Sequence, residues 1–485
     1  MLKNLLLAIL IAAPSTLLAT SAGEVAAEAR RYRQAHEQQI VDELLQFLAI
    51  PNLASDTPNI ERNAQALVAM FAKRGLTARL LRVGGAPPVV VAYLPARGAR
   101  KTIAFYAHYD GQPVDATQWS TPPWEPVVKD TRIHARSASD DKGPIIALLA
   151  ALDALRAAGI KPGVNLRFVF EGEEEDGSPH LNEYLERFDD DLAADAWMLC
   201  DGPVHQSRKQ LLYFGARGVT GAEFTVYGPS HALHSGHYGN WAPNPIVTLA
   251  HLISSMRDTN GRILIDGYYE DVRPLMAAER EALAAAPPYD REIRREVAIG
   301  RTEGEGSLNE RILQPALNLR GISGGRVGEQ ASNSIPVDAR ASIDFRLVPA
   351  QTPERVRELV ERHITRQGFF IVREVPDAAT RMAHPNVVRI VWGHGYPAAR
   401  TAMDLPIAKQ VTEIVAAAAG HDPVRLPSLG GSIPMHLFQR GGAIPAIGVP
   451  IVNHDNNQHA ANENLRLQNL WNGIEIYAAL MATLR

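Results

Sequence analysis

Two kinds of apolar pattern alternate through the first 212 residues. Short runs rich in β-branched and aromatic residues, such as KTIAFYAHYD (101–110), VNLRFVF (164–170) and DAWMLCDG (195–202), are typical of buried strands. Residues 141–159 have apolar positions at helical spacing, with acids and a proline at the start and a glycine at the end. Strands and helices that alternate in this way predict a mainly parallel sheet covered on both faces.

The pattern changes after Leu212. GVTGAEFTVYG alternates apolar and polar residues, as a strand with one exposed face does. The segments that follow predict three more strands and two helices, namely ALNLRGISGG, ARASIDFRLVP, FFIVREV, NPIVTLAHLISSM and PERVRELVERHITRQG. LPIAKQVTEIVAAAAG and IPAIGVPIV then return to the first pattern. We therefore predict one α/β domain, residues 23–212 and 391–485, interrupted by a smaller α+β domain at residues 213–390.

The first 22 residues have a different character. Lys3 precedes the apolar stretch LLLAILIAAPSTLLA, which is short for a membrane span, and small residues follow it. This pattern predicts a signal peptide that is cleaved near Ala22, and hence a secreted or periplasmic protein that is not held in the membrane afterwards. A loosely attached helix or a membrane anchor is the alternative. Cys200 is the only cysteine, so no internal disulfide can form, and a buried apolar role is expected for it.

Length and charge narrow the possible functions. A chain of 485 residues is too long for one hydrophobic core and predicts two or three domains. The formal net charge is −4 and no basic stripe stands out, so nucleic acid is a poor candidate for a partner.

Polar residues gather after the predicted strands, where ligands bind in open α/β sheets. The candidates come from five separate segments, and they are His108, Asp110, Asp140, Asp141, Glu173, Glu174, Glu175, Asp201, His454 and His459. So many acids at one sheet edge would repel one another without a cation. Two imidazoles and three or four carboxylates match the ligands of two zinc ions that share a bridging carboxylate.

Each of these motifs also has a purely structural interpretation. Asp140 and Asp141 could cap the helix that follows them. EGEEEDGS places five acids in six consecutive positions, and we expect Glu171, Glu173 and Asp176 to be a solvated face. The shared position of the motifs after apolar strands favours a joint site.

Taken together, the motifs resemble the M20 family of metallopeptidases, in its dipeptidase, carnosinase and glutamate carboxypeptidase-like branch. The matching stretches follow the family's order over nearly the whole chain after residue 22, and they are YAHYDGQPVD, SASDDKGP, EGEEEDGS, CDGP, ALHSGHYGN, SNSIP with DFRLVP, GGSIP and QHAANE. The resemblance implies a di-zinc exopeptidase-like catalytic domain and an inserted lid domain that also forms a homodimer. It also implies a cis peptide after Asp140.

The resemblance assigns a metal role to five residues. His108 and Asp201 would bind one Zn²⁺ ion, Glu175 and His459 would bind a second, and Asp140 would bridge them, with Mn²⁺ or Co²⁺ as possible replacements. Two further residues would serve the reaction. Asp110 would orient His108, and Glu174 would be the general base that takes a proton from a water between the ions and gives it to the leaving amine.

The resemblance also assigns residues to the substrate. His234 of the HSG motif would reach the active site of the partner subunit and stabilise the oxyanion. Asn333, Arg346 and Ser432, with the turn at Gly430 and Gly431, would hold the free C-terminal carboxylate of a small peptide.

The chain departs from the family pattern in two places, one in a loop before Asp140 and one within the predicted lid. Ala135-Arg136-Ser137 stands where family members often have Gly-Arg-Gly. Residues 272–288 match no motif, and we expect them to lie inside the lid and to shape substrate access.

The sequence therefore predicts a zinc-dependent exopeptidase that hydrolyses dipeptides or removes the C-terminal residue of short peptides. Two alternatives stay open at this point. One is an amidohydrolase of the same family that acts on N-acyl amino acids, as aminoacylases do. The other is a binding protein that has kept the fold without catalysis.

Overall fold

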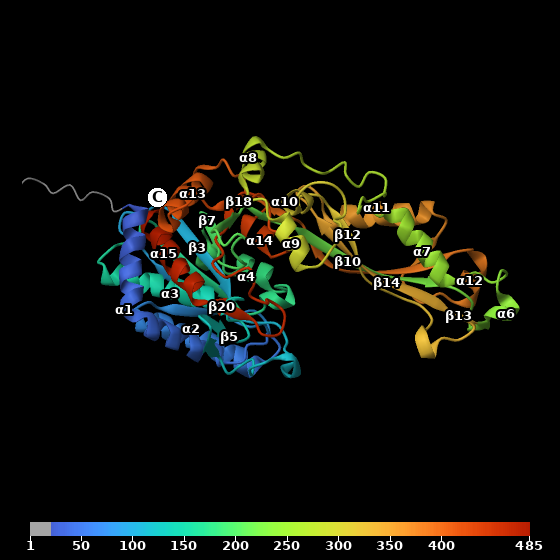
Figure 1. The fold of residues 1–485 in the computed structure, drawn as a ribbon, viewed down its shortest axis with the longest axis horizontal. Helices are drawn as coiled ribbons and strands as arrows, with labels where there is room; N and C mark the ends of the chain where they lie inside the picture. Colours follow the sequence, from blue (N-terminus) through green and yellow to red (C-terminus); the bar gives the residue numbers. More distant parts are fainter. Residues whose placement is uncertain (1–20) are drawn as a thin grey trace, which may run out of the picture.

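The computed structural model describes residues 21–485, and it consists of two domains joined side by side (Figure 1). The expected signal peptide lies outside the described residues, except for Ser21 and Ala22. The first helix, α1 (Ala22–Leu48), begins with a capping box in which Ser21 Oγ accepts from Glu24 N and Glu24 accepts from Ser21 N. None of the helices in the described part is long and apolar enough to cross a membrane.

The larger domain is built on an eight-stranded mixed sheet with the order β1-β2-β6-β3-β7-β19-β8-β18. The central strands β6, β3, β7 and β19 are parallel, whereas β1, β2 and β8 introduce antiparallel pairs. The predicted α/β class with a mainly parallel sheet is therefore confirmed for the centre of the sheet. The strands are β1 (Ala78–Leu81), β2 (Val89–Leu94), β3 (Thr102–His108), β6 (Asn165–Glu171), β7 (Ala196–Leu199), β8 (Leu211–Tyr213), β18 (Val424–Leu426) and β19 (Ala446–Gly448).

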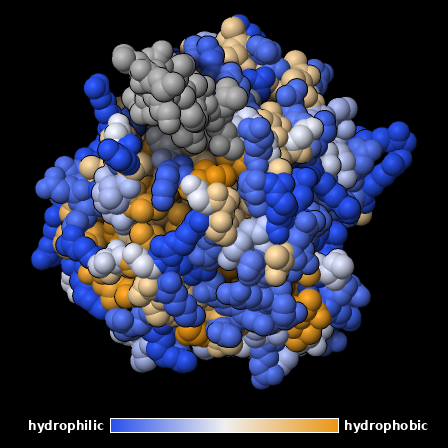
Figure 2. Space-filling view, turned by 90° about the vertical axis from the view of Figure 1, so that its left-hand side faces the viewer, coloured by the Kyte–Doolittle hydropathy of each residue, from blue (hydrophilic) through white to orange (hydrophobic). Residues whose placement is uncertain are grey.

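Helices cover both faces of this sheet. On one face α1 packs with α3 (Lys142–Ala157), α13 (Pro406–Ala419) and α15 (Leu467–Thr483), and α2 (Thr57–Lys73) lies over β1 and β2. The helix α3 is apolar almost all round because it is buried between α1, α15 and the sheet. On the other face α4 (Leu181–Arg187) and α14 (Met435–Gln439) pack against Tyr106 and Trp197. Viewed from the end that carries α1, the surface is mostly hydrophilic with smaller apolar patches (Figure 2).

The inserted domain has a five-stranded sheet with the order β12-β14-β10-β16-β15. The strands are β10 (Gly218–Tyr227), β12 (Ala316–Ser323), β14 (Asp338–Leu347), β15 (Phe370–Val372) and β16 (Val387–Tyr396). All pairs are antiparallel except β15 with β16. Buried residues alternate along β10, and this face packs on α7 (Pro245–Met256) and α11 (Pro353–Arg366). The predicted α+β unit with two helices on a sheet is thus present.

Short elements make up the loops and the connections between the domains. They are β4 (Val127–Lys129), β5 (Arg132–His134), α5 (Asp189–Leu192), β9 (Gly215–Ala216), β11 (Leu233–His234), α6 (Ser235–Tyr238), α9 (Asp290–Glu296), α10 (Leu308–Arg311), β13 (Ser334–Ile335), α12 (Ala378–Ala383), β17 (Ala399–Arg400), β20 (Asn464–Arg466) and 3-10 turns at 116–118, 174–176 and 328–330. Pairing of β9 with β17 brings the two crossings between the domains side by side. The second crossing thus comes after β16, beyond residue 390.

One segment differs from the sequence-based expectation. The helix α8 (Ala277–Ala285) does not lie inside the inserted domain but packs on β18 of the larger domain. Its Ala282 belongs to the larger core, and its buried Glu279 pairs with Arg400 at 2.7 Å. The expectation that residues 272–288 stay within the lid is therefore wrong. A salt bridge with a partner about 120 positions away leaves no local signal in the sequence.

Candidate metal centre and active site

The ends of three neighbouring strands supply the first side chains of the site. His108 is the last residue of β3, Asp201 follows β7, and Glu174 and Glu175 form the short 3-10 turn after β6. Because β6, β3 and β7 are parallel neighbours, their carboxyl ends meet at one edge of the sheet.

Two loops complete the cluster. Asp140 precedes α3, and the peptide between Asp140 and Asp141 is cis, as the family resemblance implies. His459 lies in the loop between β19 and β20, with a φ of 59°. Ser137 has a φ of 62°, a left-handed conformation that favours glycine, at the position where the family often has one.

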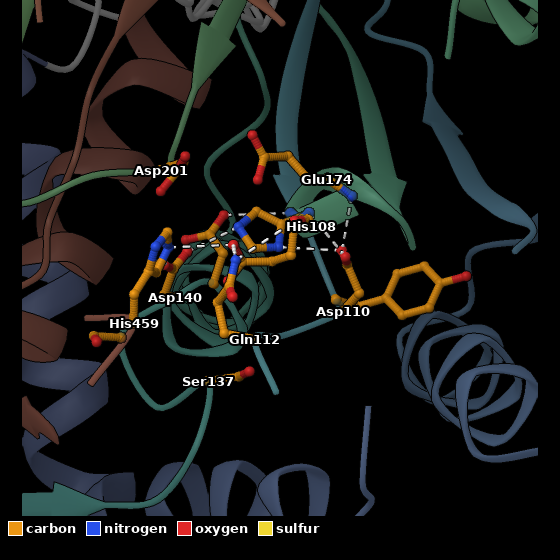
Figure 3. Close-up of polar contacts among 12 residues, drawn as sticks. His108, Asp110, Gln112, Ser137, Asp140, Glu174, Asp201 and His459 are labelled. Carbon is orange, nitrogen blue, oxygen red and sulfur yellow. Dashed lines mark hydrogen bonds and ion pairs between the residues drawn. The ribbon is translucent and has the colours of Figure 1, made fainter. Parts of the chain in front are cut away.

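Asp140 stands between the two histidines (Figure 3). Its Oδ1 lies 2.9 Å from Nε2 of His108, and its Oδ2 lies 3.1 Å from Nε2 of His459. His459 Nε2 is also 3.2 Å from Glu175 Oε2. In the described chain, candidate ligand atoms within 4.8 Å of one another form two groups, His108 with Asp140 and Asp201, and Asp140 with Glu175 and His459. The structure thus brings the five residues together in the arrangement that the resemblance implies, and their role as ligands stays a prediction.

The chemistry of this donor set fits two divalent cations. Each group offers one imidazole nitrogen and two carboxylates, with Asp140 common to both, and this suits zinc as well as other first-row metals. Asp201 Oδ1 is buried and has no hydrogen-bond partner among the described residues. A buried carboxylate oxygen without a donor is costly unless a cation faces it.

The pKa shifts within the cluster also favour bound divalent cations. Burial, followed by the charge of Asp140, raises the pKa of Asp201 to about 7. Burial would raise the pKa of Asp140 as well, but the imidazoles of His108 and His459 outweigh it and the pKa falls. Hydrogen bonds to Asp140 and Glu175 raise the pKa of His459 to about 10. Protein groups alone would thus keep a proton on His459 near neutral pH and leave Asp201 only partly ionised there, whereas divalent cations favour neutral imidazole and ionised carboxylate.

Asp110 contacts both His108 and the turn that carries Glu174 and Glu175. Its Oδ1 lies 3.3 Å from Nδ1 of His108, so it faces the ring nitrogen that points away from Asp140. The same carboxylate accepts hydrogen bonds from the backbone N–H groups of Glu174 and Glu175 at 3.1 and 3.0 Å. Asp110 therefore fixes both the imidazole and the turn that carries the two glutamates.

Glu174 lies beside the cluster without joining either ligand group. Burial raises the pKa of its carboxyl well above the ordinary value, and the negative charge of Asp201 adds to this. Its side chain lines a cavity of about 440 Å³ together with Glu175 and His459. This position suits a group that exchanges protons with a substrate in the cavity.

Two supporting residues were not identified from the sequence. The fully buried Glu463 accepts hydrogen bonds from Ser139 N and Asp140 N, at 2.9 and 3.0 Å, and pairs with Arg136 at 2.8 Å. Gln112 Nε2 donates to Glu175 Oε2 at 2.8 Å. Both belong to motifs already noted, QHAANE and YAHYDGQPVD, and their place in those motifs was the signal in the sequence.

The expectation for Glu171 and Glu173 is wrong. Both carboxylates are buried, and only Asp176 is exposed. Tyr106 Oη donates to Glu171 at 2.5 Å, and burial raises the pKa of Glu171 to about 8. Glu173 lies 2.9 Å from Nδ1 of His180. A run of acids looks solvated in sequence, but here the chain buries Glu171 and Glu173 and turns Glu174 and Glu175 toward the cavity.

The residues expected to bind the substrate fall into two places. Arg346, on β14, donates from Nη1 to Ser432 Oγ at 2.8 Å, and Gly431 is next to that serine. His234 and Asn333 lie together at the far tip of the inserted domain, where Ser235 N donates to Asn333 O at 2.9 Å (Figure 1). Asp338, where β14 begins near this tip, is eight residues from Arg346, which is roughly 26 Å along a strand. Asn333 and Arg346 of the same chain therefore cannot hold one substrate carboxylate together, although the sequence predicts that both bind it.

Three residues that line the cavity were not singled out from the sequence. They are His394, Tyr396 and His436, and they line it together with Ser432, Glu174, Glu175 and His459. His394 and Tyr396 come from the end of β16, and His436 comes from α14.

Comparisons with known proteins agree with this site. The model of peptidase family M20/M25/M40 matches residues 104–483. A Cys-Gly metallodipeptidase of Schizosaccharomyces pombe is 29% identical over 463 residues, covering 91% of this chain and 94% of that protein. A Beta-Ala-His dipeptidase of Homo sapiens is 28% identical over 418 residues, covering 81% of this chain and 76% of that protein. The crystal structure of an M20 family metallo-carboxypeptidase from Sulfolobus solfataricus is 28% identical and has a TM-score of 0.78, covering 91% of this chain and 98% of that one.

The matched region contains all five clustered residues as well as Glu174, and it spans most of both domains. The chain therefore belongs to peptidase family M20/M25/M40.

Proposed function

We propose that this protein is a zinc-dependent exopeptidase that hydrolyses dipeptides or removes the C-terminal residue of short peptides. The observation that carries the proposal is the pair of ligand groups sharing Asp140, next to a cavity that Glu174 lines together with Glu175 and His459. The relatives named above act, by their names, on Cys-Gly and Beta-Ala-His dipeptides, which supports the substrate class.

His108 and Asp201 would hold one ion, Glu175 and His459 would hold the other, and Asp140 would contact both. Two zinc ions supply Lewis-acid activation of water and of the scissile carbonyl. Asp110 keeps the His108 imidazole oriented through its Nδ1, and Gln112 holds one oxygen of Glu175.

Glu174 is the proton carrier in this proposal. Its carboxylate removes the proton from the attacking water and later delivers it to the nitrogen of the leaving amine. The pKa of Glu174 is raised mainly by burial, and nearby cations would oppose this rise because they favour the ionised carboxylate that accepts the proton.

Arg346 and Ser432 are suited to the free carboxylate of the substrate. The guanidinium is partly exposed and donates to the serine hydroxyl on the cavity wall. A planar fork of N–H donors matches a carboxylate, which explains a requirement for a free C-terminus.

A homodimer would complete the site. His234 and Asn333 cannot reach the cavity of their own chain, so we assign these roles to His234 and Asn333 of the partner subunit. The tip of the inserted domain exposes apolar side chains, with Trp241 79% and Val247 52% exposed. Exposed apolar residues in one place are typical of association surfaces.

We further propose that the protein is exported and that residues 1–22 are removed. The charged start, the short apolar stretch and the small residues near Ala22 support this. Sequencing the N-terminus of protein recovered from the periplasm tests it, with Gly23 expected first.

A substrate panel with controlled metal content tests the proposed reaction. Purified protein is stripped with a chelator, reconstituted with Zn²⁺, Mn²⁺ or Co²⁺, and assayed on dipeptides and on N-acetyl amino acids. We expect dipeptide hydrolysis that disappears on stripping and returns with zinc. Activity that survives complete metal removal would refute the proposal, and activity on N-acetyl amino acids alone would replace it with an aminoacylase function.

A further inference from the structure

Tyr396 shares a cavity with a residue proposed to bind the carboxylate and with the proposed base. It lines the same cavity as Ser432 and Glu174. It is the last residue of β16, so it stands where the inserted domain meets the larger domain.

The register of the sheet fixes the relation between Tyr396 and Arg346. Val219 on β10 pairs with Arg346 on one side and with Tyr396 on the other. Residues directly opposite one another in antiparallel strands project from the same face, so Arg346 and Tyr396 flank Val219 on one face of the sheet. Their backbones are two strand spacings apart, about 10 Å. A carboxylate bound to the Arg346 guanidinium would therefore lie on the same face of the sheet as the Tyr396 side chain.

His436 holds the tyrosine ring from the other domain. The two rings are parallel within 6°, with centroids 4.9 Å apart. His436 Nδ1 is buried and has no hydrogen-bond partner in the described chain. Burial, and then the nearby His394, lowers the pKa of His436 to about 4, so the ring is neutral near pH 7 and stacks as an uncharged aromatic group.

The tyrosine hydroxyl keeps its proton. Burial, and then the charge of Glu174, raises the pKa of Tyr396 to about 12. Arg346 and Ser432 lower the pKa of the same phenol, in keeping with the hydrogen bond that joins Arg346 to Ser432 on the cavity wall. An O–H donor is therefore present beside Arg346 over the physiological pH range.

We propose that the Tyr396 hydroxyl donates a hydrogen bond to the C-terminal carboxylate of the bound peptide, as a third donor beside Arg346 and Ser432. His436 is a positioning residue that keeps the ring in this place by stacking. The proposal rests on the proposed exopeptidase function and names the part of the substrate that Tyr396 recognises.

Tyr396→Phe tests the hydrogen bond because it removes only the hydroxyl. A hydrogen bond to a charged group predicts that KM for a dipeptide with a free carboxylate rises about 10-fold, with little change in kcat. For the same dipeptide as its C-terminal amide the variant should behave as the wild type. Tyr93→Phe, an exposed tyrosine on β2, is the matched control and should change neither value.

His436→Ala tests the positioning role. Its KM should rise for the free carboxylate, and the double variant with Tyr396→Phe should be no worse than Tyr396→Phe alone, since both act through one hydroxyl. If the increases in KM from the two substitutions add up in the double variant, His436 does not act through Tyr396.

Binding of a dipeptide analogue with a reduced peptide bond, measured by calorimetry, separates this inference from the proposed reaction. If the wild type hydrolyses no peptide, the proposed function fails, and a weaker affinity of Tyr396→Phe for the analogue would still support the carboxylate contact. An unchanged affinity and KM in Tyr396→Phe, or equal losses with the carboxylate and the amide, would overturn the inference.

Discussion

The carboxylate of Glu463 accepts a hydrogen bond from the backbone N–H of Asp140 at 3.0 Å. The same side chain accepts from Ser137 N and from both donors of Ser139, so it holds the whole loop that presents Asp140 to the two histidines. Asp140 is the residue common to both ligand groups. A buried acid in the QHAANE segment thus controls the geometry of a residue more than 300 positions earlier in the chain.

Glu463→Gln should weaken metal binding as well as stability. The amide NH₂ of glutamine would face several N–H donors, and Arg136 would lose its buried partner. We expect zinc affinity to fall about 10- to 100-fold and unfolding free energy to fall by about 3 kcal/mol. Competition with a chromogenic chelator and chemical denaturation measure the two effects.

Glu475→Gln is the matched control for that variant. Glu475 is also buried and pairs with Arg30 at 2.6 Å, but it lies on α15 away from the site. Its replacement should reduce stability and leave zinc affinity unchanged. Equal zinc affinity in the two variants would show that Glu463 has only a structural role.

Glu174→Gln should reduce turnover without loss of metal. Glu174 lies outside both ligand groups, and the amide cannot accept the proton of the attacking water. General acid–base catalysis contributes about 10²- to 10⁴-fold, so kcat should fall by that order while zinc content is retained. Elemental analysis of the assayed sample gives the control, and a loss of zinc in this variant would mean that Glu174 is a ligand.

Glu171→Gln should remove one source of pH-dependent instability. The pKa of Glu171 rises from 4.5 to about 8 on folding because of burial, so the native state keeps a proton that the unfolded chain releases. Between these two values the native stability from this group is lost at up to about 1.4 kcal/mol per pH unit as pH rises. Glutamine imitates the protonated acid, so the variant should match the wild type near pH 4.5 and exceed its stability at pH 8.

Urea denaturation of both proteins at pH 5 and pH 8, with zinc present, measures this difference. If the unfolding free energies of the two proteins change equally between pH 5 and pH 8, Glu171 is not protonated in the native state.

Mixing two inactive variants tests the proposed action of His234 across subunits. In a mixed dimer of Glu174→Gln and His234→Ala, one of the two sites has both an intact base and an intact histidine. Statistical mixing should therefore restore about a quarter of wild-type activity. His231→Ala, at an exposed neighbouring position, should be active by itself.

Size measurement of the mixture establishes that the chains associate. If the mixture remains inactive although dimers form and exchange, His234 does not serve the partner's site.

Much of the fold and of the candidate site could be predicted from local patterns. Apolar runs such as 164–170 and the helix at 142–157 produce clear periodicities, and strand ends in an α/β sheet converge on one edge. Strand ends therefore predict that His108, Glu175 and Asp201 lie near one another, and the loops with Asp140 and His459 are expected at the same edge. The division of these residues between two ions is implied only by the family resemblance.

What could not be predicted depends on long-range contacts. The helix α8 has an ordinary amphipathic pattern, and its contacts with β18 and Arg400, both distant in the sequence, place it on the larger domain. Glu171 looked solvated because sequence does not reveal that Tyr106, on the neighbouring strand, donates to it. Tyr396 and His436 belong to different domains, so their stack exists only after the chain has crossed between the domains twice.

Diffraction at the zinc absorption edge, from crystals grown with Zn²⁺, tests the central claim most directly. The account predicts two anomalous peaks per subunit, one on each side of the Asp140 carboxylate, the first next to His108 and Asp201 and the second next to Glu175 and His459. A structure with no peak between these side chains, or with zinc bound only elsewhere, would contradict it.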